Sequence, residues 1–265
     1  MSASRVVLVT GAARGIGAAT VRRLCAQGAH VVALDSCAGT VTPDGVDYPL
    51  ATREDLDAVV AQHPDQVIPV VADVRDAAAL VAAADEAVRR LGRMDAVIAA
   101  AAVISGGDPQ WRTPPAHLDA LLAVDVGGVW NAAAAVVPHM LSGPDPAGCR
   151  IVAVASAAGT HGLFGLAGYC AAKHAVIGLI RGLAADLTGT GVTAVAVSPG
   201  ATRTAMLEAT AGLYGTQTPD GFAESSRLRR LLEPDELAGT LAFCASREAG
   251  VLNGSVIEAT GGFIG

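Results

Sequence analysis

The stretch VVLVTGAARGIGAATVRRL (residues 6–24) passes from an apolar run, through a glycine-rich turn, into a segment with helical periodicity. Gly11, Gly15 and Gly17 follow the pattern T-G-x-x-x-G-x-G, which differs from the G-x-G-x-x-G spacing of other dinucleotide-binding turns. Gly11 permits a tight turn, and the two later glycines let a pyrophosphate approach the N–H groups at a helix start. The stretch therefore predicts the first β-α unit of a nucleotide-binding fold.

Six further apolar runs, rich in β-branched residues, alternate with longer alanine-rich segments. Their lengths and their lack of polar alternation are typical of strands buried on both faces of a parallel sheet. The alternation predicts a single Rossmann-type, doubly wound α/β domain over residues 1–265, with a seven-stranded parallel sheet and helices on both faces. The six additional strands are expected at residues 30–35, 66–74, 94–103, 150–156, 192–200 and 255–262.

Composition limits the classes of function. Hydrophobic residues make up 52% and charged residues 16% of the 265 residues, which excludes a disordered chain. The net charge of −7 argues against nucleic-acid binding. The five cysteines form no CxxC pair, which argues against a metal site and favours reduced thiols in a cytoplasm. Glycines interrupt the long uncharged window at residues 151–172, so we expect no membrane helix.

Two connections are longer than a βαβ unit requires. The insert at residues 36–66 contains TREDLDAVV, where Thr52 as N-cap and an acidic residue at N3 predict a capped helix. This insert leaves the sheet beside the expected adenosine position, and it either covers that position or is a surface embellishment. Residues 203–233 follow the sixth strand at the ligand-binding edge, where Tyr214 and Phe222 are expected to line a substrate pocket.

An acidic residue, Asp35, ends the second predicted strand, 18 positions after Gly17. A carboxylate at this position binds both adenosine ribose hydroxyls and repels a 2′-phosphate, which selects NAD over NADP. Arg14 inside the glycine turn is a weaker argument for NADP, so the sequence predicts NAD. Asp73, which follows the third strand, is expected to bind the adenine edge, with Val74 packed on the ring. The alternative for Asp73 is a turn residue at a strand end.

Tyr169 and Lys173 stand four residues apart in GYCAAKHAV (168–176), and Ser156 ends the fifth predicted strand. Residues four apart share a helix face, so the phenol and the ammonium are expected to lie together. The trio suits hydride transfer between a nicotinamide and an alcohol or ketone. The phenol would exchange a proton with the substrate oxygen, the serine would hold that oxygen, and Lys173 would stabilise the phenolate and grip the nicotinamide ribose. An ammonium about 4 Å away supplies about 4 kcal/mol at an effective dielectric of about 20, enough to lower the phenol's pKa by about three units.

In order along the chain, TGAARGIG, Asp35, Asp73, Ser156, YCAAK and SPGATRT resemble the motifs of the short-chain dehydrogenase/reductase family. The resemblance implies a homotetramer whose interface includes the C-terminal segment. It also implies that a cluster after the sixth strand borders the nicotinamide, formed by Pro199, Gly200, Thr202 and Thr204. Two further positions, Ile16 and Ala100, are expected to contact the cofactor.

The chain departs from the family pattern in two places. Alanines occupy positions 99–102, where the family has N-N-A-G after the fourth strand. Asp125, in AVDVGGVW, stands where the family has a catalytic asparagine that holds a water linking the lysine to solvent. We hypothesise that Asp125 accepts the water-mediated bond from Lys173 and acts as a proton acceptor, at some cost in phenol acidity. The alternative is that Asp125 satisfies backbone groups at a helix distortion.

A narrower resemblance concerns the insert, with YPLATREDLDAVV (48–60), together with ISGGDPQW (104–111) and CAAKHAVIGLIRGLAADL (170–187). These stretches resemble the mycofactocin-coupled branch of the family. The branch implies an NAD that is not released between turnovers. It also implies that the hydride passes to mycofactocin, a peptide-derived redox carrier.

Three functions are compatible with these residues. The leading hypothesis is a cytoplasmic NAD-dependent dehydrogenase that interconverts a secondary or small apolar alcohol and its carbonyl, coupled to an external carrier. The second is a freely exchanging ketoreductase of the 3-oxoacyl type, which Asp35 disfavours because NADPH is the usual donor for such enzymes. The third is a catalytically degenerate nucleotide-binding scaffold, which the intact Ser156, Tyr169 and Lys173 disfavour.

Overall fold

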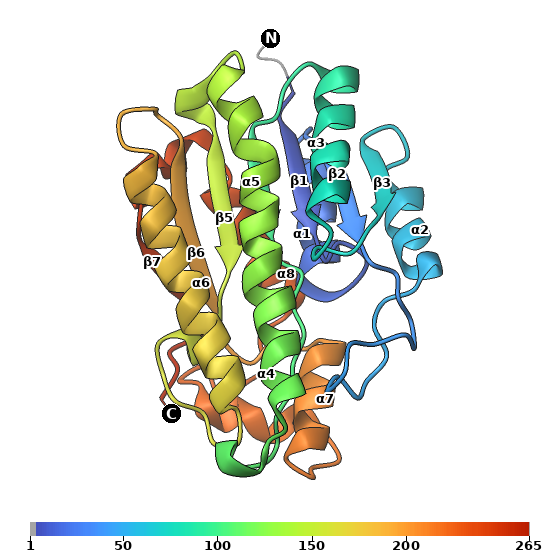
Figure 1. Ribbon diagram of the computed structural model, residues 1–265, viewed down its shortest axis with the longest axis vertical. Coiled ribbons are helices and arrows are strands. Elements are labelled where there is room, and N and C mark those ends of the chain that lie inside the picture. The colour runs from blue at the N-terminus through green and yellow to red at the C-terminus, as the bar shows by residue number, and fades with distance from the viewer. Residues whose placement is uncertain (1–3, 265) are drawn as a thin grey trace.

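The computed structural model describes residues 4–264 and has the predicted architecture of a parallel sheet between two layers of helices (Figure 1). The sheet has seven strands in the order β3-β2-β1-β4-β5-β6-β7, and every neighbouring pair is parallel. The strands are β1 (Val6–Thr10), β2 (His30–Asp35), β3 (Val67–Val71), β4 (Ala96–Ala99), β5 (Arg150–Val154), β6 (Thr193–Pro199) and β7 (Val256–Ala259).

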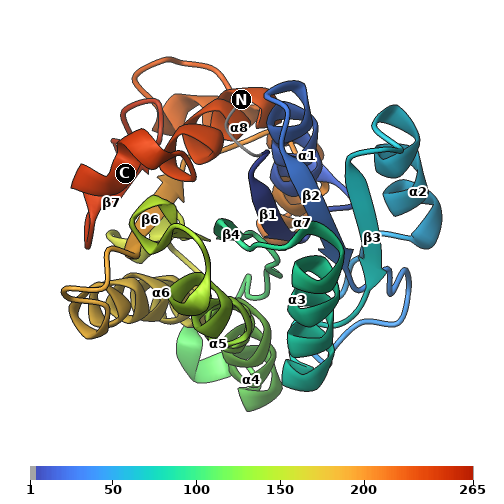
Figure 2. The same ribbon diagram turned by 90° about the horizontal axis from the view of Figure 1, so that it is seen from above.

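Helices α3, α5 and α6 cover one face of the sheet, and α1 and α8 cover the other (Figure 2). A single π-helical turn, Leu122–Val126, joins α4 to α5. Most helices lie between successive strands, as the doubly wound topology requires. Their bounds are α1 (Gly15–Ala26), α2 (Arg53–Gln62), α3 (Ala77–Leu91), α4 (Pro115–Leu121), α5 (Gly127–Ser142), α6 (Ala167–Asp186), α7 (Ala205–Leu213) and α8 (Pro234–Cys244).

The central strands are buried on both faces, as predicted. In β1, Val6 and Leu8 pack into the core beneath α3, α5 and α6, whereas Val7 and Val9 pack beneath α1 and α8. The edge strands β3 and β7 are partly exposed, which differs from the prediction of burial on both faces. An edge strand has a hydrogen-bonded neighbour on one side alone, and this also explains why β3 tolerates Pro69.

Local sequence signals fix several element ends. The predicted helix in the insert is α2, and its capping box is present: Thr52 Oγ1 accepts from the Asp55 N–H, and Asp55 Oδ2 accepts from the Thr52 N–H. The fourth strand is shorter than predicted, because the N–H groups of Ala100 and Ala101 both donate to Thr10 Oγ1 at 3.1 Å. The Thr10 hydroxyl thereby ties the end of β1 to the chain leaving β4.

One helical run within residues 4–264, Pro115–Ser142, is long and apolar enough to cross a membrane by length and composition. Its most apolar window is 56% buried, and it contains α4, the π-turn and α5, which pack against β4, α3 and α6. Burial of this kind is common in the core helices of α/β proteins.

Candidate active site

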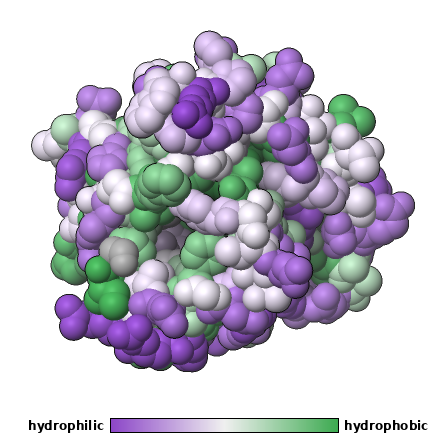
Figure 3. Space-filling model, turned by 90° about the horizontal axis from the view of Figure 1, so that it is seen from below, coloured by the Kyte–Doolittle hydropathy of each residue, from purple (hydrophilic) through white to green (hydrophobic). Residues whose placement is uncertain are grey.

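A cleft of about 530 Å³ opens where the strands end at their carboxyl termini, the edge at which open α/β sheets bind ligands. The space-filling view from this end shows the molecule hollowed near its centre, with apolar side chains around the hollow (Figure 3). The glycine turn and the ends of β2, β4, β5 and β6 form the floor. The insert and residues 202–225 form two further walls.

The glycine turn packs its backbone too closely to admit side chains at two of its three glycines. Gly11 has φ +67°, and a Cβ placed on it would lie 2.8 Å from Cα of Ala101. A Cβ on Gly17 would lie 1.9 Å from the carbonyl oxygen of Gly11, so the start of α1 packs directly on the turn. Gly15 has φ +57° and faces the cleft. The turn and the free N–H groups that begin α1 therefore form a cradle suited to a pyrophosphate.

Asp35 is held at the end of β2 by two backbone donors. Its Oδ2 accepts from the Ala13 N–H at 3.0 Å and its Oδ1 from the Cys37 N–H at 3.1 Å. Each carboxylate oxygen keeps a second acceptor position, and the residue lines the cleft. The carboxylate is thus fixed beside the glycine turn, where the sequence predicts the adenosine ribose.

Asp73 and Val74 lie at the same end of the cleft. Asp73 is paired with Arg75, with 2.6 Å between Oδ2 and Nη2 and 3.0 Å between Oδ1 and Nε. Burial raises the pKa of Asp73, but the hydrogen bonds from Arg75 outweigh it, and the pKa is lowered from its ordinary value. Contact of this carboxylate with an adenine edge stays a prediction.

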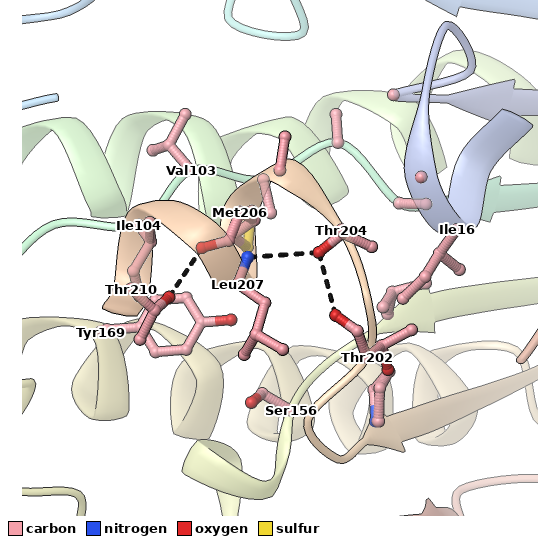
Figure 4. A pocket seen from close by; sticks show the side chains of 18 of the residues that line it. Ile16, Val103, Ile104, Ser156, Tyr169, Thr202, Thr204, Met206, Leu207 and Thr210 are labelled. Atoms are coloured by element: carbon pink, nitrogen blue, oxygen red, sulfur yellow. Dashed lines mark hydrogen bonds between the residues drawn. The ribbon is translucent and has the colours of Figure 1, made fainter. Parts of the chain in front are cut away.

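The chain after β6 forms the other end of the cofactor groove, and Thr204 caps α7 there. Its hydroxyl donates to the Thr202 carbonyl at 3.2 Å and accepts from the Leu207 N–H at 3.3 Å (Figure 4). Pro199 and Gly200 also line the cleft. The predicted contact of Thr204 with a carboxamide would share a hydroxyl that already serves this cap.

The predicted catalytic trio converges on the cleft. Tyr169 and Lys173 lie one turn apart on α6, and Lys173 Nζ is 5.5 Å from the centroid of the Tyr169 ring. Ser156 follows β5, and its Oγ accepts from the Ala158 N–H at 3.2 Å, which fixes the hydroxyl position. The Tyr169 and Ser156 hydroxyls both face the space beneath Leu207 (Figure 4).

Asp125 contacts Lys173 directly, whereas the sequence-based hypothesis placed a water between them. Nζ lies 3.1 Å from Asp125 Oδ2, which is close enough for a hydrogen bond but poorly aligned for one, so the contact is an ion pair. Oδ1 accepts from the Val103 N–H at 2.8 Å. Asp125 lies within the π-helical turn, but the backbone group that it satisfies is the Val103 N–H in the chain after β4, so its bond does not serve the helix distortion itself as the alternative proposed.

The pKa of Tyr169 is raised from its ordinary value, whereas the sequence argument expected a lowering. Burial of the phenol is the largest cause; Lys173 lowers the pKa, and Asp125 opposes Lys173. A hydrogen bond with Ser156 lowers it further, without reversing the direction. The expectation was wrong because it counted the lysine and left out the burial of the phenol, which alone outweighs the ammonium.

The insert crosses the cleft as a strap, which we define as residues 36–51. Arg14 Nη2 donates to the Pro49 carbonyl at 2.8 Å, on the side of the glycine turn. On the opposite side, the Ile104 N–H donates to the Tyr48 hydroxyl at 3.1 Å. Val46, two residues before Tyr48, is buried in the core, so the strap is packed into the fold and is not a surface embellishment.

A second contact fixes the strap on the side of Ile104. The Ser105 hydroxyl donates to the Gly45 carbonyl and lies 2.6 Å from Nδ1 of His117 on α4. Sequence reasoning missed Tyr48 and this Ser105–His117 pair, because the insert has no periodicity that reports which side chains turn inward. Tyr48 is the aromatic residue of the insert, and that was the available signal.

The remaining half of the cleft is apolar, and both aromatic residues predicted from the 203–233 segment line it. The Tyr214 hydroxyl donates to the Phe164 carbonyl at 2.6 Å, and its ring lies 5.8 Å from that of Phe222. Other side chains of this chamber include Val103, Ile104, Leu163, Met206, Leu207 and Phe263.

Comparison with known proteins identifies the family. The family described as "short chain dehydrogenase" matches residues 5–212. The chain belongs to the short-chain dehydrogenase family. Two curated members are each 34% identical to it: (-)-trans-carveol dehydrogenase of Rhodococcus erythropolis, with 97% of this chain and 96% of that protein covered, and meso-2,3-butanediol dehydrogenase of Serratia marcescens, with 98% and 94% covered.

Solved structures agree with this short-chain dehydrogenase over nearly its whole length. The crystal structure of carveol dehydrogenase from Mycobacterium avium in complex with NAD has a TM-score of 0.89 at 29% identity, with 98% of each chain covered. The crystal structure of levodione reductase has a TM-score of 0.86 at 29% identity, with 98% of this chain and 97% of that chain covered. The insert at residues 36–66 and the segment at residues 203–233 therefore belong to a fold that these relatives share.

Proposed function

We propose that this short-chain dehydrogenase is an NAD-dependent enzyme that interconverts an alcohol, secondary or small and apolar, and its carbonyl. The observation that carries the proposal is that the Tyr169 and Ser156 hydroxyls meet between a glycine cradle and an apolar chamber, with Lys173 buried behind the phenol. Relatives named for carveol and butanediol oxidation support the alcohol class. The NAD-bound carveol dehydrogenase structure supports the cofactor.

The chain's own residues fit a dinucleotide. The cradle of Gly11, Gly15 and Gly17 would take the pyrophosphate at the start of α1. The fixed carboxylate of Asp35 would accept hydrogen bonds from the adenosine ribose, and its charge disfavours a 2′-phosphate. The residues proposed at the nicotinamide end are Ala100, Tyr169, Lys173, Pro199, Gly200, Thr202 and Thr204, and those at the adenosine end include Arg14, Ile16, Asp73 and Val74.

When bound, NAD supplies a hydride acceptor and a positive charge beside the phenol. Tyr169, as phenolate, takes the hydroxyl proton of the alcohol while the hydride leaves the carbinol carbon. Ser156 holds the substrate oxygen in place, and Lys173 stabilises the phenolate that accepts the proton. In the reverse direction Tyr169 returns the proton to the carbonyl oxygen, so the same residues serve both directions.

We also propose that the NAD is held between turnovers and that its hydride passes to mycofactocin. The support is the strap, which is anchored on the glycine turn through Arg14 and on the far wall through Tyr48 and Ser105. A cofactor beneath this strap would leave only after several of these contacts break. An external carrier would then be needed to reoxidise it in place.

We further propose a cytoplasmic homotetramer. Trp130 and Leu141 on α5 are 63% and 44% exposed, and large apolar side chains displayed along one helix favour an interface. Sedimentation velocity of the purified protein tests the assembly. A monomer over the full range of concentrations would contradict it.

One preparation tests both the function and the cofactor. The protein is purified without added nucleotide, denatured, and the released nucleotide is identified and quantified by chromatography. The intact enzyme is then given secondary alcohols with and without an artificial electron acceptor. Stoichiometric NAD, with turnover that requires the acceptor, is the expected result. Turnover with free NADPH would favour a freely exchanging ketoreductase, and bound nucleotide with no turnover would favour a scaffold.

A further inference from the structure

The chamber beyond the catalytic trio carries no charged side chain among the described residues that line it. The charged residues of the cleft are Arg14, Asp35, Asp73 and Arg75 at the cofactor end, and Lys173, which is paired with Asp125. A carboxylate or phosphate on the substrate would therefore lose its hydration without gaining a counter-charge. Such a group is strongly disfavoured in an apolar site.

Three hydroxyls on α7 and the segment after it belong to residues that line this chamber, and each donates its proton to a backbone carbonyl. Thr210 Oγ1 donates to the Met206 carbonyl at 2.8 Å, as Figure 4 shows beside Tyr169. The Tyr214 hydroxyl donates to the Phe164 carbonyl at 2.6 Å, and Ser225 Oγ donates to the Phe222 carbonyl at 2.7 Å. Each hydroxyl has a single proton, so this wall offers lone pairs to a ligand and no free donor.

We infer that the substrate is an uncharged alcohol whose second polar group, where it has one, is a hydrogen-bond donor such as a second hydroxyl, received by Thr210. The inference rests on the proposed alcohol–carbonyl chemistry and narrows its substrate class. A second carbonyl, as in a 3-oxoacyl thioester or a hydroxyketone, could be served by Thr210 only after its bond to Met206 is broken. A second hydroxyl can donate to Thr210 while that bond stays intact.

One donor outside this wall needs a separate test. The Tyr48 hydroxyl accepts from the Ile104 N–H, and burial raises its pKa to about 12, so it keeps its proton at neutral pH. Tyr48 reaches the cleft from the strap and not from α7 or the segment after it. If it served a second carbonyl, substrates of the hydroxyketone class would depend on it.

The experiment compares four compounds on one ring: cyclohexanol, cyclohexane-1,2-diol, 2-hydroxycyclohexanone and 3-hydroxycyclohexanecarboxylate. When the wild-type enzyme oxidises a hydroxyl of each compound, kcat/KM is expected to be about three- to tenfold higher for the diol than for the hydroxyketone, whose second group is then the carbonyl; this is the range of one neutral hydrogen bond. The hydroxy acid is expected to fall at least about a hundredfold below cyclohexanol. Equal turnover of the acid and the neutral alcohols would overturn the inference.

Variants separate recognition from packing. Thr210→Val is expected to lower kcat/KM for the diol about three- to tenfold and to leave cyclohexanol within about twofold. Thr216→Val is the matched control, because Thr216 also donates to a backbone carbonyl shortly before it, that of Ala211 five residues earlier, at 3.0 Å, and lies outside the cleft lining. If Thr210→Val lowered kcat/KM equally for the diol and for cyclohexanol, the role of Thr210 would be structural and the inference would be wrong.

The variant Tyr48→Phe tests whether the strap supplies a hydrogen-bond donor to a second carbonyl. Unchanged relative rates on the four compounds are expected, and a selective loss of hydroxyketone turnover would overturn the claim that a second carbonyl finds no donor. Failure of the proposed function looks different: none of the compounds, nor longer secondary alcohols and their ketones, would be turned over in either direction. In that case the chemistry itself is wrong, whatever the wall recognises.

Discussion

Lys173 and Asp125 form an ion pair at 3.1 Å in which both side chains are shut off from solvent, at 2% and 0% exposure. Burial raises the pKa of Asp125, and Lys173 opposes that effect; burial lowers the pKa of Lys173, and Asp125 raises it above its ordinary value. Both pKa values are raised overall, so the lysine stays an ammonium, and the carboxyl beside it offsets part of the positive charge of the pair. This offset means that Tyr169 feels less positive charge than a lone lysine would give.

Asp125→Asn removes the negative charge and keeps a side-chain oxygen for the Val103 N–H. The pKa of Tyr169 is then expected to fall, because Asp125 contributes to its elevation. Alcohol oxidation requires the phenolate, so its rate rises as pH rises through that pKa. The rising limb of kcat/KM against pH is expected to move toward lower pH by about one unit, the size of a charge removed several ångströms away at an effective dielectric of about 20.

Asp119→Asn, at an exposed position on α4, is the matched control and is expected to leave the pH profile of kcat/KM unchanged.

The pair of Lys173 and Asp125 also contributes to the stability of the fold. Since the folded pKa of Lys173 is raised, this contribution is present below its unfolded value and is lost as pH rises through the folded value. The asparagine variant is expected to unfold more easily at neutral pH, by about 1–3 kcal/mol. An unmoved pH limb would remove Asp125 from control of the phenol.

The architecture was predictable because its signals are local and repeated. Seven apolar runs, the glycine turn and the capping box of Thr52 each follow from a few neighbouring residues, and all three are present in the structure. The edge strands were less predictable, since a run such as VIPVV looks alike whether one or two strands flank it. Exposure at β3 is decided by sheet order, which no single segment encodes.

The site was predictable where spacing on one element sets it, as for Tyr169 and Lys173. It was not predictable where distant segments meet. Tyr48 reaches Ile104 across 56 positions, and the pairing of Asp125 with Lys173 depends on how the π-turn faces α6. The predicted lowering of the Tyr169 pKa was wrong for the same reason, because the burial of the phenol is a property of the assembled cleft.

Tyr169→Phe tests the proton-transfer step. The substitution removes the phenolic oxygen and little volume, so folding and cofactor binding are expected to persist. The rate of hydride transfer is expected to fall by about a hundredfold to ten-thousandfold, the range for loss of a general acid–base group. Single-turnover absorbance of the reduced nicotinamide measures the rate, and quenching of protein fluorescence by NAD measures binding. Full activity in this variant would end the assignment of Tyr169.

Asp35→Asn tests cofactor choice. Removing the charge at the end of β2 is expected to lower the ratio of the dissociation constant for NADP to that for NAD by about ten- to a hundredfold, because repulsion of a 2′-phosphate is lost. Both dissociation constants are measured on protein stripped of its bound nucleotide. The amide can accept from one of the two N–H groups that Asp35 now binds, so a stability loss of about 1 kcal/mol is also expected. Asp73→Asn is the control: an adenine contact would weaken both cofactors equally and leave the ratio unchanged.

Gly45→Ala and Gly39→Ala form a matched pair on the strap. Both glycines have positive φ, at +83° and +56°, so each alanine carries a similar backbone cost of about 1 kcal/mol. A Cβ on Gly45 would lie 3.0 Å from the Cα and ring of His117, whereas a Cβ on Gly39 would meet its nearest atom, Cγ2 of Thr52, at 4.0 Å. Gly45→Ala alone is therefore expected to push the strap away from α4.

If the strap retains NAD, its displacement should speed the escape of the cofactor. Stopped-flow chase of bound NADH with excess NAD is expected to show release at least about tenfold faster in Gly45→Ala than in Gly39→Ala, which corresponds to about 1.4 kcal/mol of lost retention. The protein purified without added nucleotide should also carry less NAD in the first variant. Identical release rates in the two variants would show that the Gly45 contact with α4 does not hold the cofactor, and retention would then have to come from the cradle itself.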